Sequence, residues 1–171
     1  MDYIITPHDI HRWSKNPQAL YNDACRHLAS LPYPSATLDG DPGPTTCRYR
    51  YNGMCCVAGR FLPDILYDIT MENKPADGVA DILATRPCML REKMIKGGFP
   101  DYYSRADAAQ LVALFASRLM RRLQDVHDTP SNWTYDGRAM QLALIEVAAS
   151  SDLSAGILDN LDFSFKVPRP L

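Results

Sequence analysis

The longest helical pattern in this chain lies between Ser104 and Thr129. Ser104 can cap the first turn of a helix, and the Thr129-Pro130 pair ends the pattern because a residue before proline disfavours helical geometry. Apolar residues recur at three- and four-residue intervals and fall on one broad face, namely Leu111, Phe115, Leu119, Leu123 and Val126. The pattern predicts one long helix over residues 104–128, and the other elements must pack around its apolar face.

Four shorter stretches also read as helices. Asn16 can cap a helix that has Pro17 at its first position, and this helix should run to residue 31 with Leu20, His27 and Leu28 on its packing face. The other three are predicted over residues 75–84, 88–96 and 135–150, where Pro87 and Gly97-Gly98 supply end signals. A short turn or helix is also expected after Thr6-Pro7.

Two stretches favour β structure. Asn52-Gly53 is the pair that best tolerates the positive φ angles of a tight hairpin turn, so the flanking residues 46–57 are interpreted as two short strands. Leu161, Phe163 and Phe165 alternate with polar residues and predict a last strand that could pair with the hairpin. The expected fold class is therefore α+β, mainly α-helical, with a small antiparallel hairpin or sheet.

The size of the chain favours a single domain over residues 1–171. A chain of 171 residues, of which 46% are hydrophobic, can bury a substantial core but is short for two domains. Residues 32–44 contain four prolines and two glycines, and they are interpreted as a surface loop. This composition predicts one helical body with one long proline-rich connection.

Charge and hydropathy limit where such a protein can act. The formal net charge is −2, which lacks the basic excess of a general nucleic-acid binder. No apolar run approaches the ~20 residues needed to cross a bilayer, and the N-terminus has no leader pattern. Five cysteines without an export signal favour reduced thiols over disulfides. We expect a cytoplasmic protein that does not contact a membrane.

The central and C-terminal parts carry a motif that resembles a family of small proteins encoded by bacteriophages and prophages. The resemblance covers residues 45–135 and rests on Cys47-x-Tyr49-Arg50, Asn52-Gly53, Cys56, Gly59, Pro63-Asp64, the segment Leu123-Gln124-Asp125-Val126-His127-Asp128, and Trp133. It implies a bacterial host cell as the setting and no particular activity. Cys55 and the proline-rich loop are additions to the motif, and the resemblance assigns them no role.

The cysteines offer the residue types of a thiol enzyme. Such an enzyme needs a thiolate, an imidazole that activates it and an acid that orients the imidazole. Cys56 or Cys47 could serve with His127. Adjacent residues on a helix point about 100° apart, so Asp128 is not expected to bond to His127, and Asp64 would have to be the acid. The competing interpretation is that these cysteines are small buried hydrophobic residues, and we favour it.

A metal site is a weaker alternative. Structural zinc usually takes closely spaced ligand pairs such as C-x₂₋₄-C, and the chain has none. Cys47, Cys56 and His127 could form a zinc site only if the fold brought them together. We therefore expect neither a metal nor another cofactor.

Arginines and tyrosines around the predicted hairpin form the candidate binding surface. Strand alternation would place Arg48 and Arg50 on one face, with Tyr51 on the other and Arg60 nearby. Arginine beside aromatic residues also suits nucleotides or nucleic acid, but no glycine-rich phosphate loop accompanies it. A host protein is the favoured partner. The sequence thus predicts a non-enzymatic accessory protein that binds and modulates a host macromolecule, for example in counter-defence, with a small cysteine-dependent hydrolase or transferase as the alternative.

Overall fold

The computed structural model describes residues 4–32, 48–50, 53–85 and 104–165. Within these ranges the regular elements are helices, Met54 is a single bridge residue, and no strand occurs. The α-helices are α1 (Pro7–Lys15), α2 (Pro17–Ser30), α3 (Val57–Arg60), α4 (Ala76–Thr85), α6 (Arg105–Phe115), α7 (Arg118–Asp128) and α8 (Arg138–Ala149). Short 3-10 helices cover Asp64–Leu66, Ile69–Met71, Pro130–Asn132 and Gly156–Asn160.

The predicted α+β class is wrong, because the described part of the chain has no sheet. The backbone N–H groups of Tyr49 and Arg50 donate to the Glu72 carboxylate at 2.9 and 3.1 Å. A side chain thus occupies the donors that a hairpin partner would have taken. Gly53 has a φ of 75°, as a tight turn requires, but α3 begins only four residues later, at Val57. Tyr51 and Asn52 lie outside the described residues.

Helix starts follow the capping residues closely. Thr6 and Asp9 form a capping box on α1, and the Asn16 side chain accepts the Ala19 N–H at the start of α2, as predicted. Ser104 caps α6 with the help of Asp107. The predicted helices over 17–31, 75–84 and 135–150 correspond to α2, α4 and α8. The predicted helix over 88–96 and most of the proline-rich loop, residues 33–44, lie outside the described residues.

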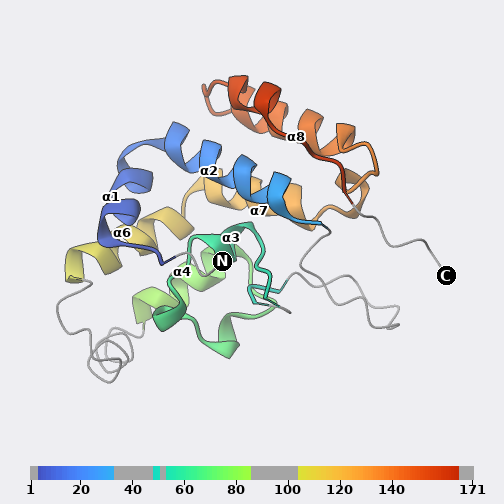
Figure 1. Cartoon of the computed structure of the whole chain (residues 1–171). Helices are drawn as coiled ribbons and strands as arrows, with labels where there is room; N and C mark the ends of the chain where they lie inside the picture. Colours follow the sequence, from blue (N-terminus) through green and yellow to red (C-terminus); the bar gives the residue numbers. More distant parts are fainter. Residues whose placement is uncertain (1–3, 33–47, 51–52, 86–103, 166–171) are drawn as a thin grey trace.

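The predicted long helix over 104–128 is interrupted. It forms two helices, α6 and α7, and the Ser117 hydroxyl accepts the Met120 N–H at 3.1 Å to start the second one. The two halves pack differently: α6 lies mainly against α1 and α4, whereas α7 lies against α2, α3 and α8 and also contacts α4 (Figure 1). Because of this break, the apolar residues of α6 and α7 can pack in two different parts of the core.

The core joins the two ends of the described chain. Its buried apolar side chains form one cluster that extends from Ile5 to Phe165. The Tyr21 hydroxyl in α2 donates to the Leu144 carbonyl in α8 at 3.0 Å. Gln18 and Ser154 exchange two hydrogen bonds of 2.9 and 2.8 Å. Figure 1 shows the result: α8 lies on one side, α2 and α7 come next, and α3 and α4 lie on the other side.

The C-terminal stretch is buried without being a strand. Phe163 and Phe165 are each 2% exposed, so the alternation reflects a buried face, and the predicted strand is wrong. Phe165 packs on the Trp133 ring with centroids 4.6 Å apart. Trp133 in turn donates its indole N–H to the His127 carbonyl at 2.7 Å and so covers the end of α7. Aromatic packing on a helix end explains the pattern that suggested a strand.

Candidate functional site

Arg50, a predicted contact residue, points into the protein. Its side chain is 25% exposed, and its guanidinium donates to the carbonyls of Gly59 and Leu62, both at 2.6 Å. It also donates to the Asp64 carboxylate at 2.9 and 2.7 Å. The guanidinium lies over the Tyr67 ring, 5.6 Å from its centroid. These contacts hold the end of α3 and leave little of the guanidinium for a partner.

The other predicted contact residues do not form an open arginine face. Arg48 and Arg60 are both partly buried, and Tyr51 lies outside the described residues. Strand alternation, which would have put Arg48 beside Arg50, does not apply because no strand forms there. The charges of Arg50, Arg60 and Asp64 all act on the Cys55 thiol, so the fold gathers these residues around Cys55.

The predicted thiol nucleophile Cys56 is fully buried. It precedes α3, and its Sγ accepts the Gly59 N–H at 3.3 Å, which makes it the cap of that short helix. Gly59 itself has no room for a side chain, because an added Cβ would lie 2.4 Å from the Tyr49 carbonyl oxygen. Cys47, the other candidate, lies outside the described residues. Cys56 therefore has a structural role at a tightly packed position.

His127 and Asp128 do share a hydrogen bond, which corrects the sequence-based expectation. His127 Nδ1 lies 2.8 Å from Asp128 Oδ1 although the residues are adjacent. Asp128 is the last residue of α7, and its carboxylate folds back along the helix, where the Gln124 amide also donates to it at 2.7 Å. The Gln124 carbonyl accepts the Ala58 N–H at 2.8 Å. The network joins the end of α7 to α3.

The sequence interpretation missed a cysteine–histidine pair. Cys55 Sγ lies 3.7 Å from Nε2 of His27, a residue expected only to pack on the face of its helix. The same Nε2 is 2.8 Å from the Cys55 carbonyl oxygen, which can only accept, so Nε2 carries a proton and donates it there. An imidazole nitrogen that already bears a proton cannot take one from the thiol.

Electrostatics keeps this pair neutral. Burial lowers the pKa of His27 to about 4, and burial raises the pKa of Cys55 to about 11. Near neutral pH the pair is therefore a thiol beside an uncharged imidazole. An activated cysteine shows the reverse, a thiolate stabilised by a cationic neighbour. The vicinity of Cys55 does not provide the acid–base chemistry of a thiol enzyme.

Metal-ligating residues do not gather in the described ranges. No group of three or more histidine, cysteine or acidic side chains there could hold a metal ion. The zinc site considered from Cys47, Cys56 and His127 depends on a residue outside those ranges.

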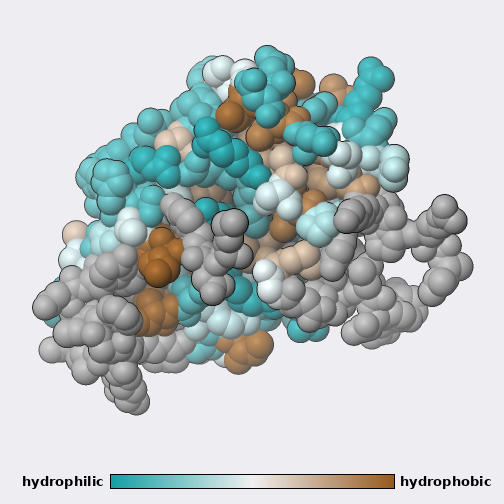
Figure 2. Space-filling view, in the orientation of Figure 1, coloured by the Kyte–Doolittle hydropathy of each residue, from teal (hydrophilic) through white to brown (hydrophobic). Residues whose placement is uncertain are grey.

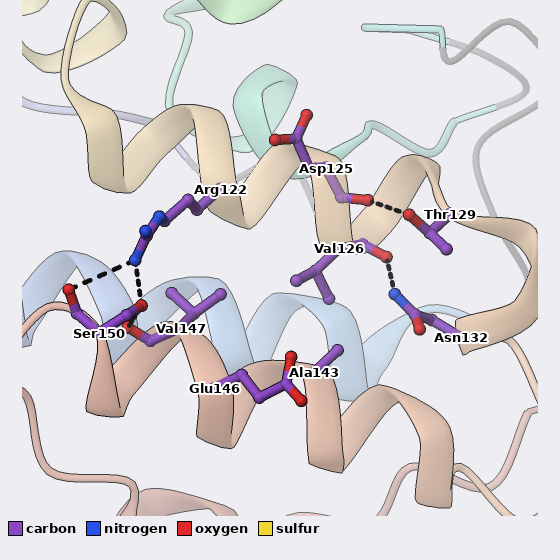
Figure 3. Close-up of a pocket in the computed structure, with 9 residues that line it drawn as sticks. All are labelled: Arg122, Asp125, Val126, Thr129, Asn132, Ala143, Glu146, Val147 and Ser150. Carbon is purple, nitrogen blue, oxygen red and sulfur yellow. Dashed lines mark hydrogen bonds between the residues drawn. The ribbon is translucent and has the colours of Figure 1, made fainter.

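The concavity that sequence reasoning did not anticipate is a groove between α7 and α8 (Figure 3). Its volume is about 480 Å³. The two helices are antiparallel, because Arg122 near the start of α7 reaches Ser150 just after the end of α8. Its lining residues come from both helices and the following turn: Arg122, Asp125, Val126, Thr129, Asn132, Ala143, Glu146, Val147 and Ser150.

One end of the groove is closed by Arg122. Its guanidinium donates to the Ser150 hydroxyl and, at 3.3 Å, to the Ser150 carbonyl, as the dashed lines in Figure 3 show. At the other end Asn132 donates to the Val126 carbonyl at 2.8 Å, and the Thr129 hydroxyl donates to the Asp125 carbonyl at 2.7 Å. These contacts fix both ends of the groove while its middle stays open.

The middle of the groove combines an apolar floor with one acidic side chain. Val126, Ala143 and Val147 supply the apolar atoms, and the exposed Glu146 carboxylate projects from α8, whereas the Asp125 carboxylate points away from α8 (Figure 3). Partial burial, and after it the charge of Asp128, raises the pKa of Asp125. Arg122 keeps its positive charge, because its acceptors on Ser150 are neutral, so the groove lining carries charges of both signs.

Exposed apolar residues adjoin the groove on α8. Leu142 is 54% exposed and Ile145 is 44% exposed. On a helical wheel Leu142 follows Glu146 on the side away from the groove floor, and Ile145 lies beyond it. Figure 2 shows hydrophobic side chains at the surface in the region of α8. The α7–α8 surface, meaning the groove together with Leu142 and Ile145, is thus partly apolar and open.

Comparison with known proteins adds no relative to this geometry. The chain has no significant match among protein-family models, curated proteins or solved structures. The resemblance to phage-encoded proteins therefore stays an expectation. Among the described residues no helix is long and apolar enough to cross a membrane.

Proposed function

We propose that this chain is a non-enzymatic accessory protein of phage type that binds and modulates a host protein through its α7–α8 surface. The observation that carries the proposal is the open groove of about 480 Å³ with an apolar floor and charged edges. Surfaces of this kind accept a partner helix or extended segment, whose apolar residues enter the groove while polar residues meet the rim.

The exposed apolar side chains support a protein partner. Large contiguous apolar patches are uncommon on soluble proteins and often mark interaction sites. Leu142 and Ile145 lie beyond Glu146 on the outer side of α8, so a partner that enters the groove and also covers this side would remove both from water. Arg122 and Glu146 give the groove charges of both signs and no basic excess, so this surface does not suit the nucleic-acid alternative.

The thiol-enzyme alternative has weaker support. The His127–Asp128 bond does supply an oriented imidazole, which favours it. Against it, Cys56 is fully buried as a helix cap, and the imidazole beside Cys55 donates its Nε2 proton to a carbonyl. Neither Cys56 nor Cys55 is therefore placed beside a base that could take its proton.

A capture experiment with a matched pair of variants tests the proposal. Ala143→Phe would fill the groove, because Ala143 is a small, partly exposed residue on its floor. Ala113→Phe is the control, because it makes the same change at an exposed position on α6. Tagged full-length chains are incubated with bacterial lysate, and captured proteins are identified by mass spectrometry.

We expect wild type and Ala113→Phe to retain the same host protein and Ala143→Phe to lose it, with equal melting temperatures for all three. If Ala143→Phe retains the partner as well as the control does, the groove is not the binding surface. If no protein is specifically retained by the wild type, the proposed function itself fails.

A further inference from the structure

We infer that two copies of this chain associate through the outer side of α8, with their two α8 helices antiparallel about a twofold axis. The contact surface is the outer stripe of α8, meaning Arg138, Leu142, Ile145 and Ala149. This inference goes beyond the proposed function, because it needs no host protein. The groove lies on another side of α8, so a host protein held there need not cover the outer stripe.

The helix α8 is apolar on two sides, although one of them alone meets the core. Met140, Leu144 and Val147 are buried against the rest of the chain. Leu142 and Ile145 point the other way and are exposed. A helix that is apolar on both sides is normally buried on both. Figure 1 shows α8 at the edge of the molecule, so its outer side faces away from the other described helices.

The residues of the outer stripe are spaced as in the seam of a coiled coil. Arg138, Leu142, Ile145 and Ala149 are all exposed and follow one another at intervals of four, three and four residues. This spacing is symmetric about the middle of the stripe. A second α8 that runs antiparallel would therefore set Leu142 of each copy against Ile145 of the other. Arg138 of each copy would meet the small Ala149.

The charges on α8 favour a second copy in this orientation. Arg138 is the first residue of α8, where its charge meets the positive end of the helix dipole. In the antiparallel pair its guanidinium lies near the C-terminal end of the other α8, within about one helical turn of the exposed Glu146 there. The twofold axis forms this contact twice. A parallel pair would instead bring the two Arg138 side chains together.

Arg138 also has an acid near it in its own chain. Its charge contributes to the lowered pKa of Asp136, but less than the hydrogen bonds that this carboxylate accepts from the Thr134 hydroxyl and the Arg138 backbone N–H. Asp136 is fully exposed, so water screens its attraction for the guanidinium. A contact with Glu146 of the other copy can therefore still stabilise the pair.

The size of the stripe limits the strength of the association. α8 has 12 residues and is therefore about 18 Å long. One pair of helices of this length buries less than the roughly 1,200 Å² of a small stable interface. We therefore expect a weak dimer, with a dissociation constant of about 10–100 μM.

Sedimentation velocity of the purified full chain from about 1 to about 500 μM tests the inference. We expect the mean mass of the wild type to rise from monomer toward dimer over this range. Ile145→Glu puts a carboxylate into the centre of the contact and should keep the chain monomeric throughout. Ile69→Glu is the matched control, because it makes the same change at an exposed isoleucine outside α8, and it should dimerise like the wild type. Melting curves check that both variants fold.

A pair of charge reversals tests the antiparallel arrangement. Arg138→Glu and Glu146→Arg each bring like charges together across the twofold axis, so each variant alone should dimerise about tenfold more weakly than the wild type. Mixed in equal amounts, the two variants carry complementary charges. The mixture should therefore recover the dimer as a mixed pair of the two chains.

Three results would overturn the inference. They are a wild type that stays monomeric at every concentration, a dimer that Ile145→Glu leaves unchanged, and a mixture of the two charge variants that dimerises as weakly as each variant alone. None of them bears on the capture of a host protein by the groove. Failure of that capture would in turn leave the dimer in place, so the two proposals fail separately.

Discussion

At the scale of single residues, Arg50 connects three separate parts of the chain by hydrogen bonds. Its guanidinium joins the backbone after α3 to Asp64, and its own backbone N–H is held by Glu72. The carbonyls of Gly59 and Leu62 depend on it for hydrogen bonds in a partly buried setting. The charge of Arg50 therefore contributes to the stability of the fold, and little of it is left for a partner.

We predict that Arg50→Met destabilises the protein by about 2–3 kcal/mol, because methionine keeps part of the apolar stem but leaves carbonyls without donors. Urea unfolding gives the measurement. Arg118→Met, at an exposed position on α7, is the control and should change little. If the urea midpoint of Arg50→Met equals that of the wild type, the internal contacts of Arg50 do not stabilise the fold, and Arg50 is again a candidate contact residue for a partner.

His27 makes stability depend on pH in a definite direction. Its pKa falls from 6.5 to about 4 on folding, so the unfolded chain binds more protons than the folded one between these values. Stability is therefore fully present above pH 6.5 and is lost as the pH falls toward 4. We predict that this residue accounts for a loss of about 2–3 kcal/mol over that window.

His27→Gln isolates the effect, because an amide can still donate to the Cys55 carbonyl but does not titrate. Unfolding measured from pH 7 down to pH 4 should show a shallower decline for the variant than for wild type. Parallel curves for the two proteins would mean that another group carries the acid sensitivity.

At the scale of elements, Ser117 decides where one helix ends and another begins. The sequence pattern over 104–128 has continuous apolar periodicity, so it predicted one helix. The hydroxyl of Ser117 competes with the helical backbone by capping Met120, and the two halves then pack on neighbours that differ except for α4. Periodicity records which face is apolar but does not show that the partner of this face changes at residue 117.

We predict that Ser117→Ala costs about 1 kcal/mol, the usual effect of losing an N-cap, and that Ser117→Asp restores most of it. Chemical denaturation of the two variants checks both statements. If Ser117→Ala is instead stabilising and adds helical signal in circular dichroism, a continuous helix is the preferred state and the cap is not what separates α6 from α7.

The elements that were predicted correctly are specified by neighbouring residues. The elements that were predicted wrongly depend on contacts with residues far along the chain. Asn16 and Pro17 specify the start of α2 from neighbouring residues alone, and that start was predicted correctly. The hairpin failed because Glu72, more than 20 residues away, takes the backbone donors of Tyr49 and Arg50. The last strand failed because alternating burial of Phe163 and Phe165 needs an aromatic neighbour, Trp133, and not a sheet.

At the scale of the whole molecule, the candidate site arises between elements. The groove lining is divided between residues 122–132 and residues 143–150, and neither stretch alone has a motif that indicates a site. The Cys55–His27 pair likewise joins residues 28 positions apart. The sequence suggested Cys56 and His127 as catalytic residues. In the fold Cys56 caps α3, and the open groove lies between α7 and α8.

The bonds between Gln18 and Ser154 also bear on how the chain is made. These residues are 136 positions apart, and Tyr21 and Leu144 are 123 apart, so α2 finds its partners near the other end of the described chain. During synthesis on the ribosome, α2 emerges before α8, and its face toward α8 stays uncovered until residue 154 has left the exit tunnel. Such distant contacts slow folding and leave apolar surface exposed meanwhile. The face of α2 toward α8 is therefore an apolar surface through which partly folded chains can associate.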